Sequence, residues 1–108
     1  YILALDILKK NLNSLNIDDK YEIIEKDCFN FFNSGHFFNE KFDIVFIDPP
    51  YKEKRTDVLI NTILENQILK KGGIIILHKH EKDESVTNTK LKIIDQRNYG
   101  ISKIIIGN

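Results

Sequence analysis

Apolar residues recur at helical spacing in two segments of the chain, residues 1–15 and residues 56–69. In both segments they return every three or four positions, which places them on one face of a helix. Thr56 opens the second segment and is a good helix-capping residue. A third, short helix is expected directly after Asp27, which can cap it. The apolar positions are Ala4, Leu8, Leu12 and Leu15 in the first segment and Leu59, Ile60, Ile63, Leu64 and Ile68 in the second.

Short apolar runs between polar or turn-forming residues predict the strands. The expected strands cover residues 21–25, 42–47, 74–77, 91–95 and 101–106. Helices and strands alternate as far as the strand at 74–77, an order typical of an α/β fold with a parallel sheet. The last two strands form a pair around a turn at 98–100, so the sheet is expected to end antiparallel. The polar segment 81–90 is expected to be an exposed loop.

Composition limits the function more than the fold. The chain has 108 residues, of which 42% are apolar and 30% charged, as in one small soluble domain. Sixteen basic residues balance sixteen acidic ones, so nucleic acid could be held only by local patches. The single cysteine, Cys28, excludes an internal disulfide and fits a reducing cytoplasm. No apolar run approaches the roughly 20 residues that cross a bilayer, so no membrane partner is expected.

The strand at 42–47 ends abruptly in Asp48-Pro49-Pro50-Tyr51. Neither proline has an N–H for a sheet ladder, and a residue before proline is held extended. The sequence therefore predicts a stiff ledge at the carboxyl end of a buried strand, carrying a carboxylate, free carbonyl groups and an aromatic ring. An ordinary exit from strand to turn would use the same residue types.

Such a ledge suits a planar amino group beside a flat ring. The Asp48 carboxylate and a proline carbonyl can both accept hydrogen bonds from an NH2 group. Tyr51 can stack on the ring, as aromatic side chains do with extruded bases. The lone pair of an exocyclic amine is conjugated into its ring, so acceptors that grip both N–H bonds would favour attack by the nitrogen.

The ledge and its surroundings resemble a known family. Asp48-Pro49-Pro50-Tyr51 after a buried strand is similar to the motif of class I amino-methyltransferases that use S-adenosylmethionine. Further segments in the same order widen the resemblance to the bacterial 16S ribosomal RNA guanine-N2 methyltransferases. These segments are residues 10–17, Asp27, residues 42–51, residues 69–73 and residues 97–100.

The resemblance implies a Rossmann-like methyltransferase sheet and a role for each matching residue. Asp48, Pro49 and Tyr51 would be catalytic, and Asp27 with Cys28 would border the adenine of the cofactor. The substrate, ribosomal RNA or a small-subunit particle, would meet further residues around the ledge, and the enzyme would act as a monomer. The further substrate residues are Pro50, Lys52, Arg55 and His78.

The chain also departs from the family pattern. The resembled enzymes hold S-adenosylmethionine with a glycine-rich loop after their first strand, whereas the first glycine here is Gly35. The chain contains no methionine and begins at Tyr1. We therefore expect residues 1–108 to be the C-terminal part of one methyltransferase domain that lacks its first strands. A DNA adenine-N6 or cytosine-N4 methyltransferase, or a noncatalytic RNA-binding module, remains an alternative.

Several candidate residues have simpler explanations. Asp27 suits helix capping as well as adenine contact, and Cys28 has no base beside it in the sequence that would make a thiolate. Lys52 and Arg55 could contact RNA phosphates or merely solvate a loop. His78 and His80 lie on one side of a strand, but only His36 remains as a third imidazole. No metal site is expected, because zinc needs three or four ligands.

Overall fold

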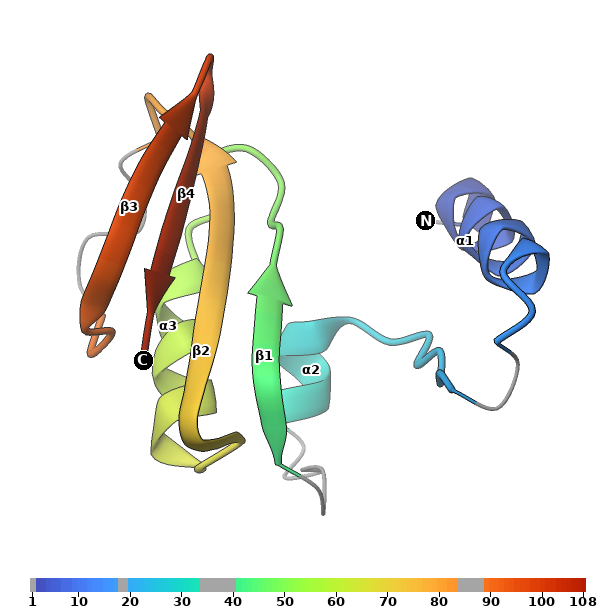
Figure 1. Cartoon of the computed structure of the whole chain (residues 1–108), viewed down its shortest axis with the longest axis horizontal. Helices are drawn as coiled ribbons and strands as arrows, with labels where there is room; N and C mark the ends of the chain where they lie inside the picture. The colour runs from blue at the N-terminus through green and yellow to red at the C-terminus, as the bar shows by residue number, and fades with distance from the viewer. Residues whose placement is uncertain (1, 18–19, 34–40, 84–88) are drawn as a thin grey trace.

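The computed structural model describes residues 2–17, 20–33, 41–83 and 89–108. The strands form one sheet in the order β1-β2-β4-β3 (Figure 1). β1 and β2 are parallel, whereas β2–β4 and β4–β3 are antiparallel. The α/β fold with an antiparallel ending is therefore as the sequence predicts. In chain order the elements are α1 (Ile2–Ser14), α2 (Cys28–Asn33), β1 (Phe42–Ile47), α3 (Thr56–Glu65), β2 (Leu69–His80), β3 (Ile93–Tyr99) and β4 (Ser102–Gly107).

The core lies between α3 and one face of the sheet (Figure 1). Helical spacing brings one stripe of α3 to that face, and the alternation of the strands supplies the other half. Ile60, Ile75 and Leu77 have no exposed surface at all. The remaining core residues are Ile47, Leu59, Ile63, Ile68 and Ile105.

The helix predicted over 56–69 ends earlier, at Glu65. The backbone turns there because Gln67 has a left-handed φ of 54°. β2 then begins at Leu69, so the two glycines lie inside the strand and do not precede it. A Cβ on Gly73 would stand 2.9 Å from the Lys70 carbonyl oxygen and 3.0 Å from that of Phe42. Glycine is needed here because the backbones of β1 and β2 approach closely.

The last two strands form a hairpin that is shifted from its predicted position. The strands expected at 91–95 and 101–106 run over Ile93–Tyr99 and Ser102–Gly107. The turn lies at Gly100 and Ile101, where Gly100 has a φ of 60°. Register pairs Tyr99 with Ser102 across β3–β4. Part of the loop expected over 81–90 lies outside the described residues, as does His36.

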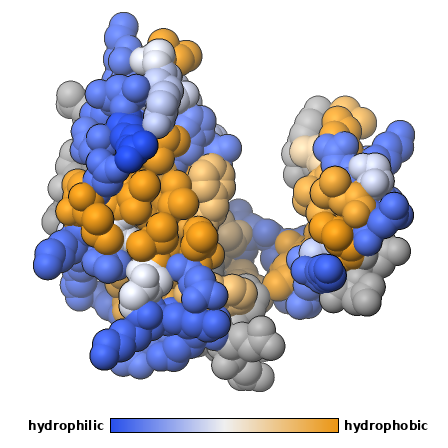
Figure 2. Space-filling view, viewed as in Figure 1, coloured by the Kyte–Doolittle hydropathy of each residue, from blue (hydrophilic) through white to orange (hydrophobic). Residues whose placement is uncertain are grey.

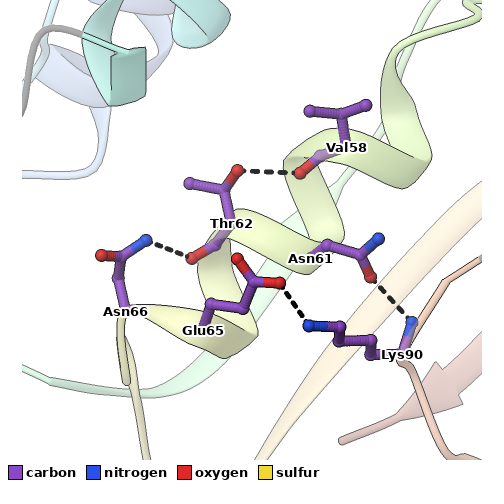
Figure 3. A network of polar contacts seen from close by, with 6 residues as sticks. All are labelled: Val58, Asn61, Thr62, Glu65, Asn66 and Lys90. Carbon is purple, nitrogen blue, oxygen red and sulfur yellow. Dashed lines mark hydrogen bonds and ion pairs between the residues drawn. The ribbon is translucent and has the colours of Figure 1, made fainter.

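The segment before β3 is tied to the exposed side of α3 (Figure 3). The backbone N–H of Lys90 donates to Asn61 Oδ1 at 2.7 Å, and the Lys90 ammonium pairs with Glu65. On α3 itself, the Thr62 hydroxyl donates to the Val58 carbonyl at 2.9 Å. The end of the predicted exposed loop is therefore held against the helix.

The strand predicted at residues 21–25 is wrong, because the structure has no strand there. An isolated extended segment gains no ladder hydrogen bonds, and a strand forms only beside a partner. β1 is the end strand of the sheet order, and in the described part of the chain β2 is its one partner. Apolar residues at strand spacing were not sufficient without such a neighbour.

The predicted first helix is confirmed as α1, but its apolar side is open. α1 lies apart from the sheet (Figure 1), and Leu3, Ile7 and Leu8 are exposed on it. On β1, Ile44 and Phe46 are also exposed. Figure 2 shows hydrophobic surface both over the sheet and on α1.

Two matched substitutions distinguish the packed face from the open one. Ile60→Ala removes a side chain that is 0% exposed, so it should lower the free energy of unfolding by about 2–5 kcal/mol. Ile44→Ala removes the same atoms at a position that is 58% exposed and should cost less than about 1 kcal/mol. Urea denaturation of the full-length protein measures both. Equal losses would mean that the face carrying Ile44 is covered in solution.

Candidate active site

The ledge predicted at residues 48–51 lies at the carboxyl end of β1. Parallel pairing of Ile47 with Leu77 places Asp48 beside His78 on β2. The Asp48 side chain is 58% exposed, so its carboxylate stands at the rim of the sheet and not in the core. His78 was expected just past the end of its strand. It lies within β2, which continues to His80 after β1 has ended.

A chain of hydrogen bonds links three strands at this rim. Asp48 Oδ1 lies 2.9 Å from His78 Nδ1, and His78 Nε2 lies 2.9 Å from the Ser102 hydroxyl on β4. Sequence reasoning missed Ser102 altogether. Only the pairing of β2 with β4 brings it to the site, and residues 78 and 102 are far apart in the sequence.

Tyr51 projects from a tight turn that follows the prolines. The Glu53 N–H donates to the Pro50 carbonyl at 3.1 Å, and Lys52 has a left-handed φ of 60°. The Tyr51 ring is exposed, and its centroid lies 4.9 Å from that of His80 in an edge-on contact. The Lys52 ammonium lies over the same ring, 5.3 Å from its centroid. The ring is therefore fixed at the rim.

Asp83 holds this turn from the segment after β2, and sequence reasoning missed it as well. Its carboxylate is buried at 5% exposure and accepts a hydrogen bond of 2.6 Å from the Lys52 backbone N–H. The Lys79 ammonium donates to the Asp83 carbonyl oxygen at 2.6 Å. In the sequence Asp83 is one charge in a polar run, so nothing local marks it as buried.

Hollows lie on both sides of the ledge. One has a volume of about 240 Å³ and a lining that includes the polar side chains of Tyr51, His78 and Ser102. The other, about 310 Å³, has mainly apolar walls that include Phe29 and Leu59. Asp48 and Pro49 line both hollows. A group bound in one hollow would therefore meet a group bound in the other at the Asp48 carboxylate. We call them the polar hollow and the apolar hollow.

Asp27 and Cys28 lie on the side of the apolar hollow. Asp27 Oδ1 accepts hydrogen bonds from the backbone N–H groups of Phe29 at 2.9 Å and Asn30 at 3.1 Å, so Asp27 caps α2. Cys28 lines the hollow itself. Partial burial, followed by the charge of Asp27, raises the pKa of the Cys28 thiol. A protonated thiol is a poor nucleophile, and Cys28 is exposed at the edge of the hollow, so it is not a buried packing residue.

Arg55 and Lys52 differ in their surroundings. The Arg55 guanidinium lies over the Phe29 ring, 3.8 Å from its centroid, and donates to Glu53 at 2.7 Å. The hydrogen bond from Arg55 lowers the pKa of the Glu53 carboxyl. Phe29 and Glu53 line the apolar hollow, so Arg55 lies beside that hollow, while Lys52 lies at Tyr51. Contact of either residue with RNA remains a prediction.

The described residues contain no cluster of three or more histidine, cysteine or acidic side chains that could hold a metal. His78 is paired with Asp48 and Ser102, and His80 Nδ1 accepts from the Lys82 N–H at 3.0 Å. Within the described ranges, no helix is both long and apolar enough to cross a membrane.

The apolar hollow suits part of the cofactor that the family resemblance implies. Its apolar walls and its volume of about 310 Å³ suit a flat heterocycle such as adenine. Asp48 at its edge would face whatever group extends toward the polar hollow. The residues present therefore fit the adenine end of S-adenosylmethionine. No glycine-rich loop precedes Gly35 in this sequence to meet the rest of the cofactor.

An α/β sheet with this ledge at its carboxyl edge is that of a Rossmann-like methyltransferase domain. The chain belongs to the family described as conserved hypothetical protein 95, whose model matches residues 3–108. A conserved hypothetical protein of Streptococcus pyogenes has the same fold, with a TM-score of 0.81, 19% identity and coverage of 96% of this chain and 64% of its own.

Curated relatives carry methyltransferase names. An uncharacterized methylase of Rickettsia prowazekii is 31% identical over 93 residues, which are 86% of this chain and 36% of the relative. Ribosomal RNA small subunit methyltransferase D of Buchnera aphidicola is 32% identical over 94 residues, which are 82% and 48%. The chain thus spans about a third to a half of these relatives. The resemblance to a ribosomal RNA methyltransferase family is confirmed.

Removing the Asp83 carboxylate should loosen the turn that carries Tyr51. In Asp83→Ala the Lys52 N–H loses its buried acceptor, which typically costs about 1–3 kcal/mol. We expect the Lys52 amide to exchange its hydrogen with solvent faster, as measured by hydrogen–deuterium exchange on the full-length protein.

The matched control is Asp43→Ala, which removes an exposed carboxylate paired with Lys70 at 3.3 Å. It should leave exchange at Lys52 unchanged. If exchange at Lys52 is as slow in Asp83→Ala as in the wild type, Asp83 does not hold the turn.

Proposed function

We propose that the full-length protein transfers a methyl group from S-adenosylmethionine to the exocyclic N2 amine of a guanine in small-subunit ribosomal RNA. One observation carries the proposal: the Asp48 carboxylate stands at the rim and lines both the polar and the apolar hollow. A methyl donor on one side and an amine on the other would meet at that carboxylate. The names of the curated relatives support ribosomal RNA as the substrate.

The target base would enter the polar hollow, where Tyr51 can stack on it. Asp48 and the Pro49 carbonyl would accept the two N–H bonds of its amine. His78 lines the polar hollow beside the base, whereas Pro50, expected to contact the substrate, lines the apolar hollow. Lys52, above the Tyr51 ring, would carry positive charge toward the neighbouring phosphates. Arg55 would add a second positive charge for the phosphates from the other side of the ledge.

In the apolar hollow, Cys28 and Phe29 would contact the adenine of the cofactor, with Asp27 holding α2 in place. When bound, the cofactor supplies a methyl group on a positively charged sulfur. Asp48 and the Pro49 carbonyl would hold the amine nitrogen so that it can accept that methyl group. The Asp48 carboxylate would stabilise the positive charge that develops on the nitrogen, which would then release one proton to water.

The chemistry needs no metal and no covalent enzyme intermediate. We expect the protein to act as a monomer in the cytoplasm, where ribosomal RNA and its particles are found. The substrate would be either the RNA alone or an assembling small subunit.

Substitution of the ledge carboxylate tests the proposal. Asp48→Ala in the full-length protein should lower methyl transfer by at least about 100-fold, because one main stabiliser of the developing charge is removed. The affinity for S-adenosylmethionine should change little, since the apolar walls of its hollow remain. Transfer is followed with a labelled methyl group on ribosomal RNA, and cofactor affinity by calorimetry.

Asp43→Ala on the same strand is the control, because it removes an exposed carboxylate away from both hollows. Unchanged turnover in Asp48→Ala would remove this residue from the mechanism. Labelling of duplex DNA in preference to ribosomal RNA would identify a DNA amino-methyltransferase instead. No labelling of either, with RNA still bound, would identify a noncatalytic RNA-binding module.

A further inference from the structure

His78 joins Asp48 to Ser102 through both nitrogens of its ring. The three side chains come from the end of β1, from β2 and from β4. Register pairs His80 with Ser102 and His78 with Ile104, so His78 and Ser102 are diagonal neighbours on one face of the sheet. His78 and Ser102 are partly buried, whereas Asp48 is exposed.

The chemistry of the groups fixes the direction of the two hydrogen bonds. An ionised carboxylate can only accept, so His78 Nδ1 carries the proton and donates to Asp48 Oδ1. In the neutral ring Nε2 then has a lone pair, and the Ser102 hydroxyl donates to it. The arrangement selects a single tautomer of His78, with the proton on Nδ1.

We propose that His78, held by Ser102, is the positioning residue for the Asp48 carboxylate. The inference rests on the proposed function and adds to it the group that orients the amine acceptor. The hydrogen bond from His78 uses Oδ1, so Oδ2 can accept from the target amine without displacing the imidazole. Without the bond the exposed Asp48 side chain would rotate among its rotamers, and the acceptor would no longer be preorganised.

The same three residue types, in the same order of contacts, occur in serine hydrolases, in which the serine attacks an acyl group. That chemistry needs backbone N–H donors for the oxyanion. Ser102 lies in β4, which pairs with β2 on one side and β3 on the other. Because both neighbouring strands use the backbone groups of β4, the backbone beside Ser102 in this strand offers no oxyanion site. The array is therefore suited to holding Asp48 and not to acyl transfer.

Two substitutions at His78 place an amide donor at different distances from the backbone. In His78→Asn the amide nitrogen is as far along the side chain as Nδ1, so it can still donate to Asp48. In His78→Gln the amide lies one bond further, level with Nε2, and the bond to Asp48 is lost. The two variants have similar polarity, so a difference between them reports the hydrogen bond itself.

We expect His78→Gln to lower kcat for RNA methylation by about 10- to 100-fold, the usual cost of removing an orienting partner. KM for RNA should be unchanged, because base and phosphate contacts remain. His78→Asn should recover most of kcat. Ser102→Ala should lower kcat in the same direction by a smaller factor. The matched control is Thr62→Ala, which removes a hydroxyl bonded within α3 and should have no effect.

A second readout does not depend on activity. Nitrogen-15 NMR of the full-length protein distinguishes imidazole tautomers, and the His78 signals are identified by their absence in His78→Asn. We expect the Nδ1-protonated tautomer in the wild type and loss of this preference in Asp48→Ala.

Failure of the positioning role of His78 and failure of the proposed methylation would give different results. Three results would overturn the positioning role while RNA methylation stands. They are an Nε2-protonated His78 ring, a tautomer that does not change in Asp48→Ala, and equal kcat values in His78→Asn and His78→Gln. A wild-type protein that methylates no RNA would overturn the proposed function, and the role of His78 in it, whatever the tautomer.

Discussion

The unequal lengths of the parallel strands β1 and β2 determine the architecture of this site. β1 cannot continue past Ile47 because two prolines follow Asp48 and have no N–H to offer. β2 has no such stop and continues to His80 with β4 as its partner. The last residues of β2 therefore extend beyond the end of β1 and form a wall. Asp48 faces that wall, and the polar hollow lies in the step between the strands.

The ledge separates two environments that differ in polarity. On the α3 side, the hollow is lined mainly by aliphatic and aromatic side chains, which favours a flat heterocycle over a charged group. On the β4 side, imidazole, phenol and hydroxyl groups offer partners for a base edge. A small sheet can thus hold two dissimilar ligands a short distance apart. Asp48 belongs to both environments because a short rigid segment carries it between them.

Local features were predictable from the sequence, and pairings between distant segments were not. Proline chemistry defines the end of β1 within a few residues, and helical spacing defines α3 except at its left-handed exit near Gln67. The strand predicted at 21–25 is absent because a short apolar run cannot show whether a partner strand is present. Ser102 and Asp83 were missed because β4 and the segment after β2 reach the site only in three dimensions.

The hairpin between β3 and β4 makes the site sensitive to length changes. Side chains alternate along a strand, and only the turn residues Gly100 and Ile101 separate the end of β3 from Ser102, the first residue of β4. An insertion or deletion of one residue at that tip would rotate β4 by half a turn and present Ile101 or Lys103 to the imidazole. Homologous proteins that retain this hydroxyl should therefore keep the tip at constant length while its residues vary, a pattern of indels readable from sequences alone.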